Sequence, residues 1–215
     1  MERITLEEFL NDARHAAQVA TVLKQEGLVC FPCRGTYRIA ASLLSETAVL
    51  ALLQVKRRSR RKPALVLLPD ARALDQLASE IPPGARKLMR ELWPGALTIR
   101  LPIRREAFPD KVYRELSKPD RKLGFRLADG PVARTVAQQA ALPLLVSSAN
   151  LSQKVGATSV AAIRKNFSRS VELLVDCGDL PQGPPSTVVD FDGDGYRMVR
   201  AGLVTEEQIA RACAA

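Results

Sequence analysis

The densest group of charged side chains in this 215-residue chain is a basic run suited to holding phosphate or carboxylate groups. Six of the seven residues from Lys56 to Lys62 are lysine or arginine, and Lys56 and Arg58 stand two positions apart. Lysine supplies a compact point charge and arginine a planar fork of donors, a combination that suits polyphosphates and carboxylates. The run alone is equally compatible with a solvated basic loop or with contacts to an RNA backbone.

A second polar group, Ser147-Ser148-Ala149-Asn150, comes at the end of an expected strand, Leu142–Ser147. In α/β proteins ligands collect beyond the carboxyl ends of the strands. Two hydroxyl groups and a carboxamide placed there can donate several neutral hydrogen bonds to an anion. The alternative is an ordinary polar exit from a strand. The sequence has neither G-x-G-x-x-G nor G-x-x-x-x-G-K-[ST], so neither common phosphate-binding loop applies.

The cysteine and histidine content restricts the remaining chemistry. His15 is the only histidine, which excludes a histidine-based triad and a multi-histidine metal site. Cys30 and Cys33 have the C-x-x-C spacing of redox pairs and zinc half-sites. A redox pair needs a helix to begin there and activate a thiol, but Pro32 and Gly35 flank Cys33 and no helix pattern begins. We therefore expect Cys30 in a strand, Cys33 in a loop and no metal site; a redox or metal role is the lesser alternative.

Composition is typical of a folded globular protein. Hydrophobic residues make up 47% of the chain and charged residues 26%, and no apolar run approaches the ~20 residues of a membrane span. The N-terminus has no signal-peptide pattern, so we expect a cytoplasmic protein without membrane contact. The 32 basic and 23 acidic residues give a net charge of +9, which predicts an anionic partner: nucleotide, nucleic acid or carboxylate.

Helical and strand patterns alternate around these residues, which predicts an α/β fold in one domain over residues 1–215. Thr5-x-x-Glu8 is a capping box that opens a helix over Leu6–Glu26, and the stretch Cys33–Leu44 is expected to be irregular. Further helices are expected at Ser45–Val55, Asp70–Ser79, Ala85–Leu92, Gly130–Ala140, Ser159–Asn166 and after Thr205. Strands are expected at Leu28–Phe31, Ala64–Leu68, Leu97–Leu101, Leu123–Leu127, Leu142–Ser147, Glu172–Val175, Ser186–Phe191 and Tyr196–Val199.

Taken in order, several short motifs resemble one family over most of the chain. They are Pro32…Tyr37, Lys56-x-Arg58 with Pro63-Ala64-Leu65, Trp93-Pro94-Gly95-Ala96-Leu97-Thr98, Gly124-Phe125-Arg126-Leu127, Leu144–Ser152, Pro185–Asp190 and Arg200-Ala201-Gly202. Each motif is weak alone, but their order and spacing are similar to the YrdC/Sua5/YciO family of threonylcarbamoyl-AMP synthases, in its short single-domain form.

The resemblance implies a twisted mixed sheet flanked by helices, with a large basic cavity. It also implies a reaction in which L-threonine, bicarbonate and ATP, the last with Mg²⁺, give L-threonylcarbamoyl-AMP and pyrophosphate. A separate transferase then modifies adenosine 37 of tRNA. By motif, the catalytic positions are Lys56, Arg58, Ser148 and Asn150, and further ligand-contacting positions are Tyr37, Arg126, Ser147, Ser186 and Arg200.

The first motif departs from the family pattern P-T-[ED]-T-x-Y-G-L. Cys33 and Gly35 replace its threonines, Arg34 replaces its acid, and Arg38 replaces its glycine. These positions border the amino-acid end of the family's cavity, where lost hydroxyl groups weaken recognition of threonine. A second hypothesis is therefore a non-catalytic or differently specific paralogue that binds RNA or nucleotide through the same basic cavity.

Overall fold

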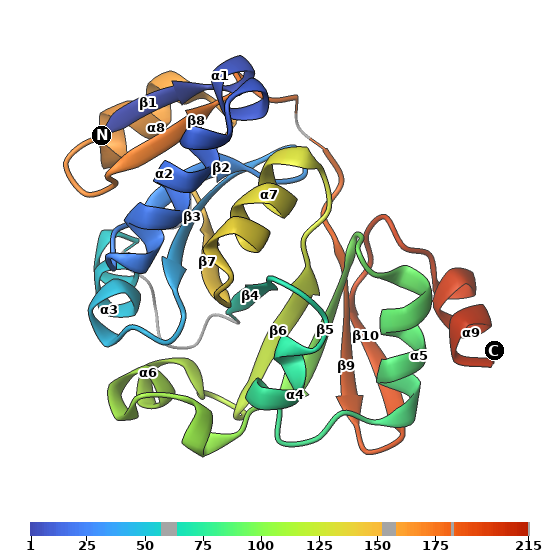
Figure 1. Ribbon diagram of the computed structural model, residues 1–215. Helices are drawn as coiled ribbons and strands as arrows, with labels where there is room; N and C mark the ends of the chain where they lie inside the picture. The colour runs from blue at the N-terminus through green and yellow to red at the C-terminus, as the bar shows by residue number, and fades with distance from the viewer. Residues whose placement is uncertain (57–63, 152–157, 182, 215) are drawn as a thin grey trace.

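The computed structural model describes residues 1–56, 64–151, 158–181 and 183–214, which form one α/β domain around a twisted sheet (Figure 1). The described strands are β1 (Glu2–Thr5), β2 (Val29–Pro32), β3 (Tyr37–Ser42), β4 (Leu65–Leu68), β5 (Leu97–Pro102), β6 (Lys122–Leu127), β7 (Leu144–Ser148), β8 (Leu173–Asp176), β9 (Thr187–Asp192) and β10 (Gly195–Arg200). The helices are α1 (Leu6–Asn11), α2 (Ala13–Lys24), α3 (Glu46–Val55), α4 (Ala73–Leu77), α5 (Pro83–Leu92), α6 (Asp110–Leu116), α7 (Pro131–Ala140), α8 (Val160–Phe167) and α9 (Glu206–Ala214), with a 3₁₀ turn at Arg105–Ala107.

The sheet is mixed, as expected. Its ten strands lie in the order β1-β8-β2-β3-β7-β4-β6-β5-β9-β10. The pairs β1–β8, β2–β8, β4–β6 and β5–β9 are parallel, and the other five are antiparallel. The prediction of a single-domain α/β fold with a mixed sheet flanked by helices is confirmed.

The expected helix from Leu6 to Glu26 is wrong, because the chain breaks it at Asp12. The capping box is present: the Glu8 amide donates to Thr5 Oγ1 over 3.2 Å, and the Thr5 amide donates to Glu8 Oε2 over 2.8 Å. Asp12 then takes an extended backbone conformation and its carboxylate accepts from the Arg14 amide at 2.9 Å. Its side chain thus caps a second helix and competes with continuation of the first.

The expected irregular stretch Cys33–Leu44 is also wrong, because β3 lies within it. Arg34 and Gly35 have φ angles of 51° and 65°, and this tight turn folds β3 back antiparallel to β2. β3 is buried between β2 and β7, so its sequence, Tyr37–Ser42, lacks the polar alternation of a half-exposed strand. Cys30 lies in β2 and Cys33 in the loop, as predicted.

The N-terminal strand β1 was not expected from the sequence pattern. It is four residues long and pairs in parallel with β8, where Arg3 Nε donates to Asp176 Oδ2 over 2.5 Å. The two strands expected near the C-terminus are present as β9 and β10, which pair antiparallel around Gly193. The stretch between β5 and β6 contains the 3₁₀ turn and the two-turn helix α6.

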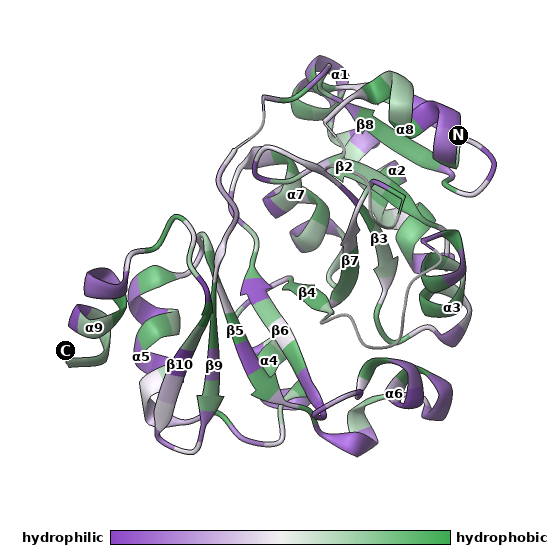
Figure 2. Ribbon diagram, turned by 180° about the vertical axis from the view of Figure 1, so that it is seen from behind, coloured by the Kyte–Doolittle hydropathy of each residue, from purple (hydrophilic) through white to green (hydrophobic). Residues whose placement is uncertain are grey.

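The two faces of the sheet are covered differently. On one face an apolar cluster joins α1, α2 and α7 to residues of β1, β8, β2, β3, β7 and β4. On β6, β5 and β9 the same face carries polar side chains instead, among them Arg126, Arg100 and Asp190. Figure 2 shows the change, because β6 is hydrophilic at both ends while the strands on the α7 side are mostly hydrophobic. Of the predicted site residues, Arg126 lies on this polar face. No helix among the described residues is long and apolar enough to cross a membrane.

Gly202 provides a test of how the last two strands are held. A Cβ atom there would lie 2.4 Å from the Pro185 carbonyl oxygen and 2.6 Å from the Thr187 nitrogen, so the backbone around Ser186 would have to move. We expect Gly202→Ala to lower the free energy of unfolding in urea by about 2 kcal/mol. Gly195→Ala is the matched control, since its Cβ would only reach the Asp192 oxygen at 3.7 Å. Equal stability of the two variants would contradict this packing.

Candidate functional site

Lys56 joins the end of α3 to the polar group that follows β7. Its side chain is buried, with 4% of the residue exposed, and Nζ donates to the Ser148 carbonyl oxygen at 2.5 Å and to Asn150 Oδ1 at 3.3 Å. Ser148 Oγ donates to the same Asn150 oxygen at 2.6 Å. Lys56 Nζ also lies 5.6 Å from the centre of the Phe167 ring, a favourable cation–π position. The structure therefore brings together three of the four predicted catalytic residues; we call them the lysine cluster.

Arg58, the fourth, lies outside the described residues. Ser147 precedes Ser148 on β7 and pairs with Ile39 of β3. Because consecutive side chains of a strand point to opposite faces, Ser147 faces away from Ser148. Ser147 therefore lies on the face of Ile39, opposite the Ser148 side chain.

A cavity of about 160 Å³ lies beside the β2–β3 turn, and we call it the arginine pocket. Three guanidinium groups line it, those of Arg34, Arg38 and Arg126. The full set of described lining residues is Arg34, Gly35, Thr36, Arg38, Arg126, Thr158, Gly183, Pro184, Pro185 and Ser186. The pocket is basic, in line with the cavity that the sequence predicts.

The arginines of this pocket are held by few partners among the described residues. Arg126 is 1% exposed, and its Nη2 donates to Cys33 Sγ at 3.1 Å. Arg34 Nη1 lies 2.9 Å from Asp129 Oδ2. The buried Nε atoms of Arg34, Arg38 and Arg126 have no hydrogen-bond partner in the described part of the chain. Buried donors of this kind are costly unless a ligand or water satisfies them.

The positive charges of the arginines in and beside this pocket repel one another. Burial lowers the pKa of Arg38, and the positive charges of Arg126 and Arg200 lower it further, while Cys33 acts in the opposite direction. Burial also lowers the pKa of Arg200, with Arg126 adding to the effect. Arginine stays protonated at neutral pH in proteins, so these side chains carry their charge into the pocket. A negatively charged ligand would relieve the repulsion.

Ser186 lines the arginine pocket and is held by Arg200, which is not among the described lining residues. Arg200 donates through Nε to the Ser186 carbonyl oxygen and through Nη2 to Ser186 Oγ, both at 3.0 Å. Thr98 Oγ1 lies 3.2 Å from Ser186 Oγ. The predicted pair Ser186 and Arg200 is thus brought together. Thr98 also belongs to this group. It was not predicted as a site residue, although it ends the Trp93–Thr98 motif.

Tyr37 is predicted to contact ligand, and in the structure its hydroxyl takes part in a network of backbone hydrogen bonds. The side chain is fully buried; its hydroxyl donates to the Gly178 carbonyl oxygen and accepts from the Cys177 amide, each at 2.8 Å. Burial raises the pKa of this phenol. In this arrangement Tyr37 positions the turn after β8 against β3.

Strand register explains why remote residues share one face. Arg38 on β3 pairs with Ser148 on β7, and β7 pairs with β4, where Leu67 lies opposite Arg126 of β6. Partners directly opposite one another project from the same face of a sheet, so the side chains of Arg38, Ser148 and Arg126 lie on one face. The lysine cluster and the arginine pocket therefore adjoin at the Arg38–Ser148 pair.

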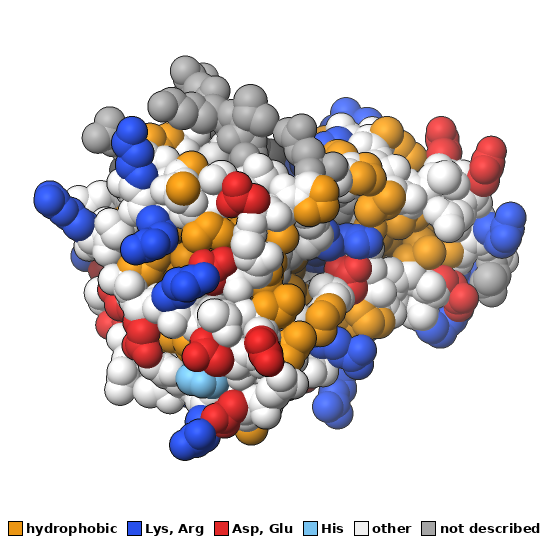
Figure 3. All heavy atoms as spheres, turned by 90° about the horizontal axis from the view of Figure 1, so that it is seen from above, with side chains coloured by type: hydrophobic (Ala, Val, Ile, Leu, Met, Phe, Trp, Pro, Cys, Tyr) orange, Lys and Arg blue, Asp and Glu red, His pale blue; other side chains and the backbone are white. Residues whose placement is uncertain are grey.

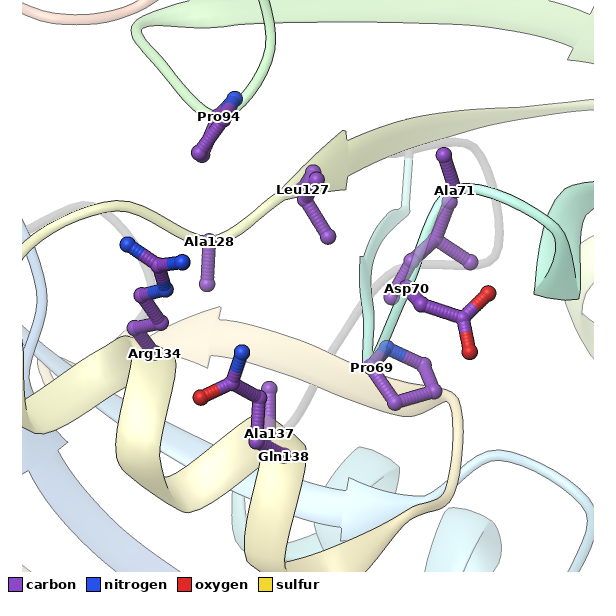
Figure 4. A pocket seen from close by; sticks show the side chains of 10 residues that line it. Pro69, Asp70, Ala71, Pro94, Leu127, Ala128, Arg134, Ala137 and Gln138 are labelled. Atoms are coloured by element: carbon purple, nitrogen blue, oxygen red, sulfur yellow. The ribbon is translucent and has the colours of Figure 1, made fainter.

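A second cavity of about 160 Å³ was not predicted. It lies beyond the carboxyl ends of the parallel strands β4 and β6 and against α7 (Figure 4). Arg134 and Gln138 come from α7, and Asp70 follows β4. Asp70 Oδ1 already accepts from the amides of Arg72 and Ala73, which caps the turn before α4. This cavity presents few converging polar groups, and the arginine pocket is the better candidate.

All four cysteines have free thiols. Burial raises the pKa of Cys30, although the nearby Lys56 lowers it. Among the described residues, no group of three or more His, Cys, Asp or Glu side chains gathers where it could hold a metal ion. Cys33 is instead the acceptor for Arg126, a role that the sequence pattern did not indicate.

Comparison with known proteins agrees with this fold. A family profile described as telomere recombination, that of Sua5, YciO and YrdC, matches residues 21–202. Threonylcarbamoyl-AMP synthase from Bacillus subtilis is 31% identical over 206 residues, which cover 96% of this chain and 58% of that protein. A putative threonylcarbamoyl-AMP synthase from Mycobacterium tuberculosis is 30% identical over 92% of this chain and 88% of its own.

Solved structures of Sua5 and YciO proteins have a similar fold. The crystal structure of Pyrococcus abyssi Sua5 complexed with L-threonine matches with a TM-score of 0.85 and 26% identity, covering 98% of this chain and 60% of that one. Escherichia coli YciO matches in fold, with a TM-score of 0.79 over 94% of this chain and 95% of its own.

The fold and the basic site thus define a YrdC-like α/β protein. The chain belongs to the Sua5/YciO/YrdC family. It spans little more than half the length of the Bacillus and Pyrococcus relatives, 58% and 55% of them.

The buried hydroxyl of Tyr37 predicts a pH dependence of stability. The pKa of Tyr37 is raised in the folded protein. The protonated phenol therefore contributes fully to the free energy of unfolding below the pKa of an unfolded tyrosine, about 10. This contribution is lost progressively as the pH rises above that value. We expect the unfolding free energy of the wild type to fall more steeply above pH 10 than that of Tyr37→Phe. Urea unfolding from pH 8 to 11 measures this, with Tyr113→Phe, a partly buried tyrosine of α6, as the control. Parallel curves for wild type and Tyr37→Phe would contradict the assignment.

Proposed function

We propose that this protein is a nucleotidyltransferase of the threonylcarbamoyl-AMP synthase type. Its substrates are ATP, bicarbonate and an amino acid, and L-threonine is the amino acid that its family relationships suggest first. The products are a carbamoyl-AMP conjugate of the amino acid and pyrophosphate. Curated relatives at about 30% identity carry the threonylcarbamoyl-AMP synthase name, which supports the reaction class.

The observation that carries the proposal is the lysine cluster next to the arginine pocket. Lys56, Ser148 and Asn150 converge at the end of β7 and supply a cation, a hydroxyl and a carboxamide. Arg38, directly across from Ser148, begins a second group of cations that extends to Arg126. Two adjacent anion-binding groups suit a reaction that brings a phosphate chain to a carboxylated amine.

The reaction needs positioning and charge neutralisation more than a protein nucleophile. The amine of the amino acid and bicarbonate first condense to a carbamate with loss of water. A carbamate oxygen then attacks the α-phosphorus of ATP, and the bond from that phosphorus to the bridging oxygen breaks, so that pyrophosphate leaves with the electron pair. Lysine and arginine side chains stabilise the charge that builds up on the departing phosphates.

Mg²⁺ is expected to enter with ATP. Mg²⁺ usually keeps several water ligands and binds largely through substrate phosphates. When bound, the ion would neutralise phosphate charge. In this scheme the product passes to a separate transferase that modifies adenosine 37 of tRNA, in the cytoplasm.

Pyrophosphate release provides the first test. We expect release that requires ATP, bicarbonate and an amino acid together, measured by a coupled pyrophosphate assay. Lys56→Ala should weaken ATP binding about tenfold, equivalent to about 1.4 kcal/mol, by removing the ammonium of the lysine cluster. Arg58→Ala is expected to act in the same direction.

The control is Lys24→Ala, an exposed lysine at the end of α2, which should leave ATP affinity unchanged. Thermal melting of each variant separates lost binding from lost folding. Wild-type ATP affinity in a folded Lys56→Ala protein would refute the role of the lysine cluster. Absence of pyrophosphate release with every amino acid tried would refute the reaction.

A second candidate function is binding of RNA or nucleotide without turnover, which the altered β2–β3 turn and the net charge of +9 favour. On the face seen in Figure 3, however, positive and negative side chains are interspersed over the described surface. RNA binding through phosphate contacts predicts a steep fall of log K with log salt concentration. We expect a shallow slope for a tRNA anticodon stem-loop between 50 and 200 mM salt, as measured by fluorescence anisotropy. A slope steeper than about −3 would instead support the RNA-binding function.

A further inference from the structure

The arginine pocket has more positive charge than a neutral amino acid can use. Arg34, Arg38 and Arg126 line it, and none of its described lining residues is acidic. The nearest described counter-charge is Asp129, which pairs with Arg34 at 2.9 Å. One carboxylate against three guanidinium groups leaves an excess of about two positive charges.

The described protein groups leave part of this charge unmatched. Arg126 is 99% buried, and the Nε atoms of all three arginines are buried without a partner in the described chain. Guanidinium groups prefer paired hydrogen bonds to a carboxylate or phosphate. The lowered pKa of Arg38, caused by burial and then by Arg126 and Arg200, reports the repulsion that such a ligand would offset.

Two of the three arginines are peculiar to this chain's first motif. Arg34 stands where the family pattern has an acid, and Arg38 where it has glycine. Arg34 adopts a φ of 51°, and the next residue, Gly35, packs so closely on Gly183 and Pro181 that a Cβ would lie 3.0 to 3.2 Å from their backbone atoms. The turn is therefore packed against Pro181 and Gly183, and Arg34 lines the pocket.

The position of the pocket separates it from the phosphates of ATP. Under the proposed function the lysine cluster binds the phosphate chain, and Arg38 lies across the β3–β7 pair from Ser148. The arginine pocket is then left for the second substrate. Its volume of about 160 Å³ is sufficient for a single amino acid.

We propose that the arginine pocket binds an amino acid whose side chain is itself a carboxylate, aspartate or glutamate, and that Arg34 and Arg38 are its specificity residues. The α-carboxylate and the side-chain carboxylate together match the excess charge of the pocket. Threonine supplies only the α-carboxylate. This inference rests on the proposed function, because it names the amino acid used at the same site.

Calorimetric titration tests the inference separately from turnover. L-Aspartate, L-glutamate, L-threonine and inorganic phosphate are each titrated into the full chain saturated with a non-hydrolysable ATP analogue. We expect one of the two acidic amino acids to bind at least about tenfold more tightly than threonine. Arg34→Gln and Arg38→Gly should each reduce that preference about tenfold, while Arg86→Gln, an exposed arginine of α5 paired with Asp75, should not.

The outcomes are distinct. Threonine binding as tight as that of both acidic amino acids overturns the inference, as does an acidic preference that survives both substitutions in folded protein. Phosphate binding that depends on Arg34 and Arg38, with no binding of acidic amino acids, also overturns it and assigns the pocket to a phosphate group. Failure to bind the ATP analogue at all would instead refute the proposed function. Pyrophosphate release with aspartate or glutamate in place of threonine would support both.

Discussion

The buried ammonium of Lys56 is the interaction on which the rest of the site depends. Removing a charge from water is costly unless hydrogen bonds replace the water, and Lys56 obtains them from the Ser148 carbonyl and the Asn150 carboxamide. These bonds hold the end of α3 against the exit of β7. The same bonds orient Asn150, and Asn150 in turn accepts from the Ser148 hydroxyl. The need to hydrogen-bond the buried ammonium thus fixes the positions of the Lys56 cation, the Ser148 hydroxyl and the Asn150 carboxamide.

The sheet determines how the remaining cations are arranged. Because α1, α2 and α7 cover one face only as far as β4, that face becomes polar on β6, β5 and β9. Charged residues there are either neutralised by the protein or directed at the pocket. Arg100 belongs to the first kind, since Asp190 and Asp120 lie 3.0 and 2.6 Å away. Arg126 belongs to the second, and this difference separates structural charge from candidate binding charge.

Short sequence motifs predicted those elements that are stabilised by contacts between residues close together in the chain. The capping box at Thr5 is a contact between near neighbours, and it was predictable. β1 was not, because its partner β8 lies near the other end of the chain. β3 was not either: it forms a hairpin with β2, but its buried sequence carries no polar alternation, and its other partner, β7, is remote in the chain. The same holds for the site. The motif at Ser148 indicated its residues, but the role of Tyr37 depends on the turn after β8, which no spacing reveals.

The distances along the chain have a consequence for synthesis on the ribosome. Lys56 and its acceptor Ser148 are separated by 92 positions in the chain. Arg3 of β1 and its acceptor Asp176 are separated by 173 positions. At translation rates of about 5–20 residues per second, the nascent chain must carry an unpaired β1 for roughly 10–35 seconds. The anion-binding groups come together only after β7 emerges. A growing chain therefore has no site with which to capture nucleotide before most of the sheet has been made.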